Sequence, residues 1–390
     1  MKVLYAPDTS DHPNWGCRFM GNWYRRELAR RGGAPGWRLG SRWFFRLPEG
    51  MPEPRTWADV QRIGEDVRRG RLALGEVGKV LAACDLVLMN GENFIRPNVL
   101  KGRLLLVFAY LASRVYGKRC ILTNLTLDLS DPALAEMAAQ VLPALAQVHV
   151  REQVSLAAYG AHVPGAAAQF YPDPAWTARP RPVEEWGPLA RLDGHLSAWP
   201  DVVEGFDPFA PYVTLSASSV FAAPGADLEK AVPGFIELAR RLRALVPQVL
   251  LVASCEVDAM LMRQVAARTG LPLLGLGIPV EQAIDVLAHA RVHLGGRWHP
   301  GIFATTGGTP LVAFEANTHK MRTLVHELQP AAPVFDPCRL GEQLDDVLAH
   351  ARSQLAGGDR LRAALRAHAQ AMGVRVGGSL DHIFPSGVAS

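Results

Sequence analysis

The chain has 390 residues, of which 49% are hydrophobic and 20% are charged, a composition typical of a globular protein with two domains. The net charge of +4 is mild, so it favours small anionic ligands or weak membrane-surface contact and argues against nucleic-acid binding. The five cysteines form no CxxC pair, and the longest apolar run, residues 104–112, is too short to span a bilayer. The first residues are typical of a strand rather than a signal peptide, so we expect a cytoplasmic protein.

In the first half of the chain, apolar strand-like runs alternate with helical patterns, which indicates parallel βαβ units. We expect strands at 2–6, 85–90, 119–125, 148–150 and 168–171, and helices at 18–31, 57–69, 75–83, 99–116, 132–146 and 152–160. The segment 32–57 is rich in Gly, Pro, Arg and Trp, so we expect an irregular excursion that serves as a lid or acceptor loop. The first helix carries Arg25, Arg26, Arg30 and Arg31, for which a solvated face is a better interpretation than contact with anionic lipid.

Residues 177–210 break this alternation with many prolines and tryptophans, which is typical of a domain boundary. The alternation then resumes. We expect strands at 212–216, 248–253, 272–276, 291–294, 310–315 and 333–336, and helices at 226–246, 256–268, 280–289, 302–306, 318–327, 340–354 and 359–372. The pattern predicts an α/β protein with two Rossmann-like domains that face each other across a cleft. The expected division is 1–176, a linker at 177–210, and 211–390.

The segment 291–315 reads as strand, tight glycine turn, short helix and second strand. Arg297 and His299 follow the turn, and Pro300 occupies what we expect to be the first helical position. A helix N-terminus attracts anions, the Arg297 guanidinium matches a carboxylate or phosphate, and an imidazole exchanges protons near neutral pH. The alternative is structural, with Arg297 in a surface ion pair and His299 as a helix cap. The position at the carboxyl end of a strand favours the binding site.

Other residues that handle anions or protons also lie just past predicted strands. They are Asp8, Asn14, Glu92, Arg151, Glu315, Asn317 and Lys320. Two interpretations of Arg151 remain open, since it either points into a cleft or pairs with a neighbouring acid. Asp173 reads more readily as a turn cap than as a catalytic group. The sequence contains no phosphate-binding GxxxxGK[ST], no GxGxxG after a strand, no GxSxG, no DxD pair and no zinc-ligand spacing. We therefore expect neither a metal nor a cofactor.

Several short motifs, in order, resemble those of the polysaccharide pyruvyl transferase family. Asn14-x-Gly16 follows the first strand, Arg151-Glu-x-x-Ser155 follows a later one, and Asp173-Pro-Ala175 comes after that. The most specific block is Gly296-Arg-Trp-His299, followed by Gly308-Thr-Pro-Leu-Val and then Lys320. The resemblance covers most of the chain, except that 32–57 and 177–210 match nothing in it. Asn90-Gly-Glu-Asn also replaces the family's glycine-rich stretch, and Thr123–Asp128 replaces a strand that usually contains Gly-Pro.

This resemblance implies a GT-B-like fold, with 1–176 on the acceptor side and 211–390 on the donor side. It also implies transfer of a pyruvyl ketal group from phosphoenolpyruvate to a sugar of a cell-surface polysaccharide or its precursor. The residues matching Arg151, Arg297 and His299 handle the donor in that family. We expect His299 to act as the acid, Asp8 or Glu92 to act as the base, and Lys320, Asn14, Glu315 and Asn317 to bind substrate.

Two other interpretations remain open at this stage. A GT-B glycosyltransferase would use the same fold and basic groups on a nucleotide-activated sugar, and a non-enzymatic or degenerate relative would use the cleft for binding or assembly. The expected partners are phosphoenolpyruvate and a sugar or lipid-linked oligosaccharide, with no nucleic acid. An acceptor linked to lipid would place the protein in the cytoplasm with peripheral contact at the inner membrane surface.

Overall fold

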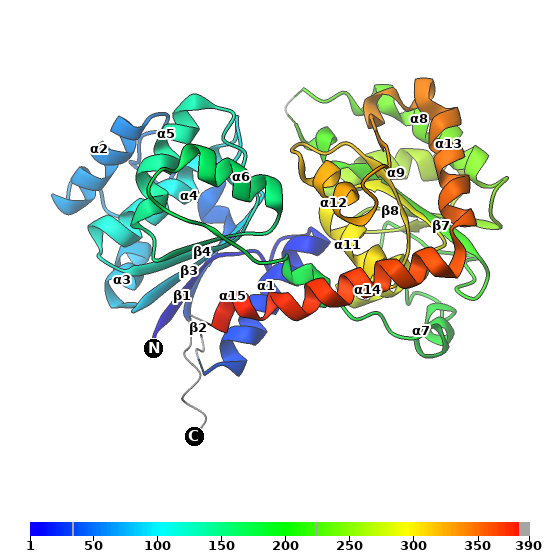
Figure 1. The fold of residues 1–390 in the computed structure, drawn as a ribbon, viewed down its shortest axis with the longest axis horizontal. Coiled ribbons are helices and arrows are strands. Elements are labelled where there is room, and N and C mark those ends of the chain that lie inside the picture. The colour runs from blue at the N-terminus through cyan, green and yellow to red at the C-terminus, as the bar shows by residue number, and fades with distance from the viewer. Residues whose placement is uncertain (33–34, 224, 382–390) are drawn as a thin grey trace. The chain divides into compact units, whose positions relative to one another are not determined.

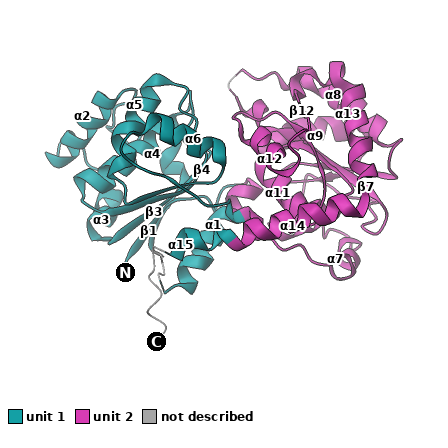
Figure 2. Ribbon diagram, in the orientation of Figure 1, with its two compact units in different colours: residues 1–12, 20–174, 375–390 teal, residues 13–19, 175–374 magenta. Residues whose placement is uncertain are grey.

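The computed structural model describes residues 1–32, 35–223 and 225–381. Within it the chain forms two compact units (Figure 2). Unit 1 contains Met1–His12, Met20–Pro174 and the chain from Arg375, whereas unit 2 contains Pro13–Phe19 and Ala175–Val374. The first turn of helix α1 (Trp15–Arg30) therefore belongs to unit 2, although most of that helix belongs to unit 1.

Unit 1 is built on a parallel six-stranded sheet with the order β2-β1-β3-β4-β5-β6. Its strands are β1 (Val3–Asp8), β2 (Pro35–Gly40), β3 (Leu86–Glu92), β4 (Arg119–Leu125), β5 (Gln147–Val150) and β6 (Gln169–Phe170). Besides α1, its helices are α2 (Trp57–Arg68), α3 (Gly75–Ala83), α4 (Leu100–Tyr110), α5 (Pro132–Val141), α6 (Gln153–His162) and α15 (Gly378–Asp381). Figure 1 labels β1 to β4 and the helices of this unit.

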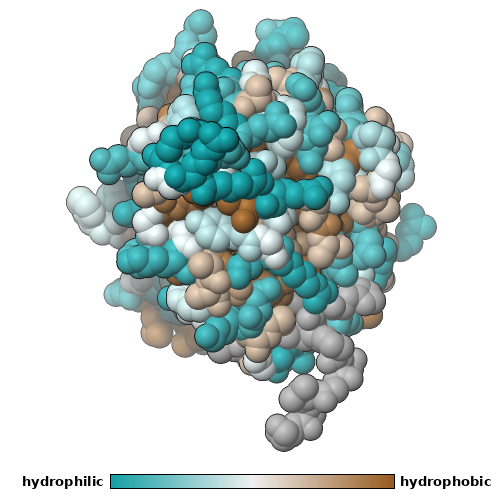
Figure 3. All heavy atoms as spheres, turned by 90° about the vertical axis from the view of Figure 1, so that its left-hand side faces the viewer, coloured by the Kyte–Doolittle hydropathy of each residue, from teal (hydrophilic) through white to brown (hydrophobic). Residues whose placement is uncertain are grey.

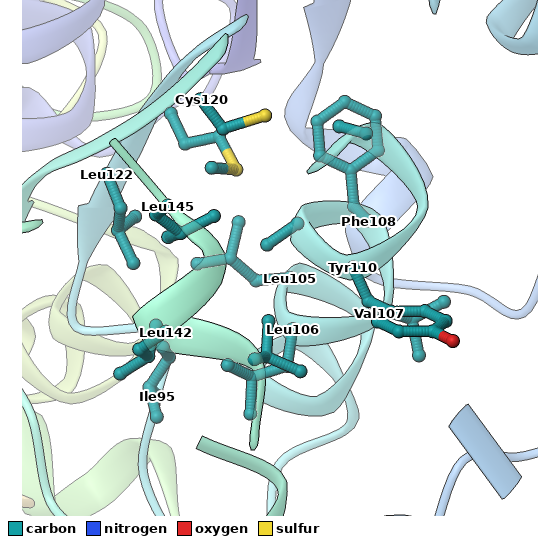
Figure 4. Packing of buried hydrophobic residues seen from close by; sticks show 14 of the residues in the cluster. Ile95, Leu105, Leu106, Val107, Phe108, Tyr110, Cys120, Leu122, Leu142 and Leu145 are labelled. Atoms are coloured by element: carbon teal, nitrogen blue, oxygen red, sulfur yellow. The ribbon is translucent and has the colours of Figure 1, made fainter. Parts of the chain in front are cut away.

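Both faces of this sheet are buried, which explains why its central strands read as nearly continuous apolar runs. In β3, Val87 and Met89 join the core formed with α2, α4 and α5, and Leu86 and Leu88 are buried on the opposite face. Figure 4 shows part of the core between the sheet and these helices, where leucines of α4 pack near Leu122 and Cys120 of β4. On the other face Tyr5 packs against Tyr24 of α1, with ring centroids 5.7 Å apart.

Unit 2 has a second parallel six-stranded sheet with the order β12-β11-β10-β7-β8-β9. Its strands are β7 (Tyr212–Ser218), β8 (Gln248–Val252), β9 (Leu273–Leu274), β10 (His293–Gly296), β11 (Leu311–Phe314) and β12 (Val334–Phe335). Its helices are α7 (Val183–Ala190), α8 (Leu228–Leu242), α9 (Glu256–Thr269), α10 (Val280–His289), α11 (Trp298–Thr306), α12 (Lys320–Leu328), α13 (Leu340–Ala356) and α14 (Gly358–Val376). Helix α14 ends with Arg375 and Val376, and these two residues group with unit 1.

The structure confirms the predicted fold class, because two parallel sheets with helices make two Rossmann-like units. Most predicted elements lie within a few residues of the observed ones, and β4, α3 and α10 match the prediction exactly in their bounds. One prediction about a loop is wrong. Within 32–57, which was expected to be irregular, the chain forms β2 and a short 3-10 helix (Ser41–Phe44). Strand β2 pairs with β1 at the edge of the sheet, where a weakly apolar strand suffices.

The predicted linker 177–210 groups with unit 2 and contains helix α7. Two ion pairs hold this segment to the rest of the unit. Arg181 contacts Asp285 at 2.5 Å, and Asp201 contacts Arg263 at 2.6 Å. The chain from Arg375, which was expected in the second domain, groups with unit 1. There Asp381 contacts Arg31 at 2.7 Å and Phe170 lies 4.8 Å from the Arg375 guanidinium.

No helix in the described ranges is both long and apolar enough to cross a membrane. The face of the molecule in Figure 3 is mainly hydrophilic, with only scattered apolar side chains. Two of the arginines for which lipid contact was weighed form ion pairs, Arg30 at the end of α1 with Glu27 at 2.7 Å and Arg31, just after the helix, with Asp381.

Candidate active site

Unit 2 changes its winding direction between β7 and β10, because the chain proceeds from β7 to β8 and β9 on one side and to β10, β11 and β12 on the other. Such a switch point leaves an opening at the carboxyl ends of the two strands, where open α/β sheets bind ligands. The loops at this point begin with Ser219 after β7 and Arg297 after β10. The Ser219 hydroxyl donates to the Gly296 carbonyl at 3.4 Å, which joins the two strand ends.

Arg297 is the N-cap residue of α11 and is nearly buried, with 10% of its side chain exposed. Its Nε and Nη2 lie 2.9 and 2.7 Å from Oδ1 of Asp258, a fully buried residue of α9. The other carboxylate oxygen of Asp258 accepts from the Ser254 hydroxyl at 2.8 Å and the Ser254 amide at 3.2 Å. Burial disfavours the charged guanidinium, but Asp258 more than offsets this, so the pKa of Arg297 is raised and its charge is retained.

Cys255 lies beside this pair as the N-cap of α9. Burial, followed by the Asp258 charge, raises the pKa of its thiol to about 11. The thiol therefore stays protonated at neutral pH and is not a nucleophile in this state.

His299 is the second residue of α11, and it packs against the first turn of α1, which also belongs to unit 2. A Cβ added to Gly16 would lie only 2.7 Å from Cε1 of the imidazole and closer still to Nδ1 and Cγ. The backbone of this turn is fixed by the Trp15 amide, which donates to the Ser254 carbonyl at 3.0 Å. Asn14 caps the same turn, since its side-chain oxygen accepts from the Cys17 amide at 3.2 Å. The Asn-x-Gly motif thus has a structural reason, namely close approach of a histidine.

Lys320 and Asn317 lie just beyond β11, on the same side of the unit-2 sheet as Arg297. The Lys320 amine donates to the Asn317 side-chain oxygen at 3.0 Å, and the Asn317 amide donates to the Ser219 hydroxyl at 3.2 Å. Lys320 is the first residue of α12 and is largely buried, at a position where a cation is unfavourable unless an anion is present. Glu315, predicted to bind substrate, pairs with Arg322, whose Nε lies 3.0 Å from the carboxylate.

In unit 1 the switch point lies between β1 and β3. Glu92, the last residue of β3, is buried and accepts hydrogen bonds from Thr9 and Asn90, both at 2.8 Å. Asp8 ends β1 and is held differently, since its carboxylate lies 3.3 Å from the Arg38 guanidinium and accepts from the Ser10 amide at 3.0 Å. The two predicted bases therefore sit at adjacent strand ends in unlike surroundings.

Two residues at this edge have left-handed backbone torsions, which residues other than glycine rarely adopt. Glu92 has φ of 39° and Asn124, at the end of β4, has φ of 57°. The Asn124 side chain donates to Asn90 at 3.1 Å, so both residues belong to one buried polar network. Local strain of this kind costs about 1–3 kcal/mol per residue and tends to concentrate at functional sites.

Arg151 directly follows β5 and is buried, with 2% of its side chain exposed. Its Nη1 lies 2.8 Å from Asp173, a fully buried residue, and its Nε donates to the Thr126 hydroxyl at 2.8 Å. Of the two interpretations left open by the sequence, the ion pair with a neighbouring acid is the one observed. Asp173, which was expected to be a turn cap, is the ionic partner of Arg151.

Sequence reasoning missed four residues that hold the predicted ones in place. Asp258 and Ser254 position Arg297, Thr126 positions Arg151, and Ser219 joins the two strand ends of the unit-2 switch point. The local signals were the serine pair at the junction between β7 and the loop that follows it, and the serine shortly before α9. Within the described residues, no group of three or more His, Cys, Asp or Glu side chains is arranged to hold a metal ion.

The two parallel sheets with their helices define the chain as a GT-B-like protein with two Rossmann-like units. Solved structures of this class are similar over nearly the whole chain. A putative UDP-N-acetylglucosamine 2-epimerase from Listeria monocytogenes has a TM-score of 0.57 at 12% identity, covering 98% of this chain and 94% of that one. The spinosyn rhamnosyltransferase SpnG with thymidine diphosphate has 0.51 at 13%, covering 98% and 99%. A UDP-forming trehalose-phosphate synthase from Burkholderia vietnamiensis has 0.51 at 13%, covering 95% and 82%.

The family follows from the sequence itself. The family model for polysaccharide pyruvyl transferase matches residues 5–317, and the chain therefore belongs to that family. This confirms the resemblance seen in the short motifs. No curated relative matches the chain. The low identities to the solved structures establish the fold alone, so the roles predicted for Arg151, Arg297 and His299 stay predictions.

Proposed function

We propose that this protein transfers a pyruvyl group from phosphoenolpyruvate to a sugar of a cell-surface polysaccharide or its precursor, as a ketal. The observation that carries the proposal is the family match across residues 5–317 together with Arg297 and His299 at the start of α11. Phosphoenolpyruvate carries a carboxylate and a phosphate. A guanidinium whose charge is retained, a helix N-terminus and the nearby Lys320 offer complementary groups for such a dianion.

The chemistry needs one acid and one base. His299 donates a proton to the methylene carbon of phosphoenolpyruvate, which becomes a methyl group, and C2 becomes oxocarbenium-like. A sugar hydroxyl attacks C2 as a carboxylate takes its proton, the bond from C2 to the phosphate oxygen breaks, and a second hydroxyl closes the ketal. Of the two hydroxyl protons, one replaces the proton given to the methyl group and the other leaves with phosphate. A positioned acid contributes about 10²–10⁴-fold to such a step.

Glu92 suits the role of base better than Asp8. The Asp8 carboxylate is already engaged by the Arg38 guanidinium, which lies 3.3 Å away. Glu92 accepts hydrogen bonds from Thr9 and Asn90, which orient one of its carboxylate oxygens. The strained backbone at Glu92 also fits a residue retained for function.

The acceptor on this proposal is a sugar or a lipid-linked oligosaccharide, and the protein works in the cytoplasm with peripheral contact at the inner membrane surface. The donor is phosphoenolpyruvate, with no further cofactor and no nucleic-acid partner.

The test is release of phosphate from phosphoenolpyruvate in the presence of a panel of sugar and lipid-linked acceptors. We expect release that depends on the acceptor, a ketal product by mass spectrometry, and loss of both with His299→Ala. His162→Ala, an exposed histidine of α6, is the matched control and should behave as wild type. Thermal-shift measurements separate the proposal from nucleotide-sugar transfer. Stabilisation by nucleotide sugars and not by phosphoenolpyruvate, with no acceptor-dependent release, would overturn it.

A further inference from the structure

One stretch of unit 1 exposes apolar side chains between arginines. After strand β2 and the short 3-10 helix that follows it, the chain passes through Phe45, Arg46 and Leu47. Phe45 and Leu47 are 42% and 39% exposed, and Arg42 and Arg46 are exposed as well. Residues 36–47 contain three arginines and no acid. The carboxyl end of this edge strand therefore presents apolar and cationic groups to solvent together.

Buried neighbours on either side hold the two apolar side chains at the surface. Phe44 is fully buried, and its ring centroid lies 5.4 Å from that of Phe108 in helix α4. Met51 returns the chain to the same core, where it is 5% exposed. Because the segment is anchored at both ends in a close-packed core, Phe45 and Leu47 have no room to turn inward. Their exposure is therefore a property of the fold.

A lysine of helix α4 lies over the exposed ring of Phe45. The Lys101 amine is 5.6 Å from the centre of this ring and 4.6 Å from the centre of the Phe94 ring. The two ring centroids are themselves 6.0 Å apart. An ammonium over aromatic faces is attracted to them, so the cation stays beside the apolar surface. Positive charge and apolar area thus coincide at Phe45.

Two arginines of this stretch lack the ionic partners that other surface arginines of unit 1 have. In and just after helix α2, Arg62, Arg68 and Arg69 each lie within 3.6 Å of an acid of that helix. Among the residues that the structure describes, neither Arg42 nor Arg46 is in an ion pair. Their charge is therefore available to an anionic surface outside the chain.

A third arginine, Arg38, is paired, since it lies 3.3 Å from Asp8. The other acids near this surface are Asp11, 3.6 Å from the position of a Cβ added to Gly40, and Glu49. We call the surface the basic apolar patch. It consists of Arg38, Arg42, Phe45, Arg46, Leu47 and Lys101. Its four cations outnumber the three acids beside them.

A second exposed apolar stretch, in unit 2, has the opposite charge. Leu192 and Trp199 are 60% and 93% exposed, which is more than either Phe45 or Leu47. The segment 177–210 that contains them carries six acids and three arginines. An anionic surface would repel this stretch and attract the basic apolar patch. Charge, rather than exposed apolar area, therefore distinguishes the partners that the two stretches fit.

We propose that the basic apolar patch docks unit 1 on a bilayer that contains anionic phospholipids. The cations approach the negatively charged headgroups, while Phe45 and Leu47 enter the boundary between headgroups and acyl chains. Both contributions are needed, because two side chains bury little apolar area and a few surface cations are screened by salt. The inference rests on the proposed function for the reason that the protein meets a membrane, namely a lipid-linked acceptor.

The first experiment measures sedimentation of the full-length chain with vesicles, without phosphoenolpyruvate or acceptor. One set of vesicles is phosphatidylcholine, and the other is an equal mixture of phosphatidylcholine and phosphatidylglycerol. We expect binding to the mixture alone, and its loss in about 1 M salt, where the screening length falls to about 3 Å. Equal binding to both sets, or binding to neither, would overturn the inference.

The second experiment repeats the measurement with variants of the patch. Arg42→Gln combined with Arg46→Gln should weaken binding about 30-fold, because each cation at an anionic membrane surface contributes about fivefold. Phe45→Ser combined with Leu47→Ser should weaken it about tenfold, because the inserted apolar area is lost. An unchanged midpoint of thermal unfolding shows that each variant is folded. Wild-type binding by either folded variant contradicts the proposal.

Two matched controls lie in unit 2. Arg352→Gln combined with Arg360→Gln removes the same charge from exposed positions of helices α13 and α14. Leu192→Ser combined with Trp199→Ser removes more exposed apolar area than the patch variant does. Both controls should bind the mixed vesicles as wild type does. Weakening equal to that of the patch variants would show that the patch is not the docking surface.

Phosphate release with a soluble sugar acceptor tests the proposed function separately, because it requires no membrane. The patch variants should release phosphate as wild type does. A chain that binds mixed vesicles through the patch but releases no phosphate with any acceptor supports this inference and refutes the proposed function. A chain that releases phosphate but binds no vesicles does the reverse.

Discussion

The contact between Gly16 and His299 yields a specific prediction for Gly16→Ala. Helix propensity favours alanine at this position, whereas the space taken by the imidazole requires glycine. Gly16 is the second residue of α1 and its φ does not lie in the left-handed region. In a helix, replacing such a glycine by alanine ordinarily stabilises by about 0.5–1 kcal/mol. At Gly16 the new methyl group would lie 2.7 Å from Cε1 of His299 and nearer to two other ring atoms. Gly16→Ala therefore gains helix propensity and displaces the imidazole.

The size of the displacement sets the expected loss. Carbon atoms in contact lie about 3.5 Å apart, so the ring must retreat by at least the difference between this and 2.7 Å, or ~0.8 Å. The nearer atoms require more. Misplacing a reacting group by 1 Å costs about 10²-fold in rate. We expect kcat of Gly16→Ala to fall by about 10²-fold, while the midpoint of thermal unfolding changes by no more than a few degrees.

Two controls separate this mechanism from general damage. Gly160→Ala lies in helix α6, where an added Cβ meets nothing within 4 Å, so it should be slightly more stable and fully active. In a double-mutant cycle, Gly16→Ala should have almost no further effect on kcat once His299 is alanine, because there is no ring left to displace. Full activity of Gly16→Ala, or the same loss in both backgrounds, would refute the reasoning.

Three further outcomes follow from the described contacts. Burial lowers the pKa of the His293 imidazole to about 3. Between that pH and about 6.5, the imidazole therefore binds a proton in the unfolded chain but not in the folded one. The free energy of unfolding then falls by up to about 1.4 kcal/mol per pH unit as the pH drops through this range. Urea titrations at several pH values should show this slope reduced in His293→Asn and retained in the exposed control His162→Asn. Arg297→Lys should raise KM for phosphoenolpyruvate at least tenfold and leave the pH optimum unchanged. The reason is that the lysine ammonium cannot contact both Asp258 and phosphoenolpyruvate, whereas the planar guanidinium has donors for both. Thr56→Ala removes the capping box of α2 and should cost about 0.5–2 kcal/mol in urea titrations with kcat unchanged.

The sequence predicted those parts of the molecule whose cause is local. The alternation of apolar runs with helical patterns predicted both parallel sheets, and the glycine turn before Arg297 predicted that a helix starts nearby. Even there the helix begins at Trp298, so Pro300 is its third residue rather than its first. A proline is tolerated throughout the first turn, and its presence alone does not say which position it takes. Strand β2 was missed because an edge strand in a Gly- and Arg-rich segment carries little apolar signal.

The parts that sequence could not predict depend on partners far along the chain. Asp258 is 39 residues from Arg297, and nothing in its own helix distinguishes it from an exposed acid. Asp173 looked like a turn cap because aspartate before proline usually is one, and only the topology places it beside Arg151. The assignment of Pro13–Phe19 to unit 2 had no local signal either. Motif reading predicted residues for ligand contact, and the structure adds the residues that hold some of them in place.

The two switch points also explain why the predicted residues are spread through the whole sequence. In a doubly wound sheet, loops that follow strands far apart in the chain meet at one edge, because the winding reverses there. Asp8 and Glu92 come together in unit 1 because β1 and β3 are neighbours, and Ser219 and Arg297 come together in unit 2 because β7 and β10 are neighbours. A substitution within a motif therefore acts through contacts that the motif does not contain. Gly16 is such a case, since its own helix would prefer alanine and only the imidazole of a distant motif requires glycine.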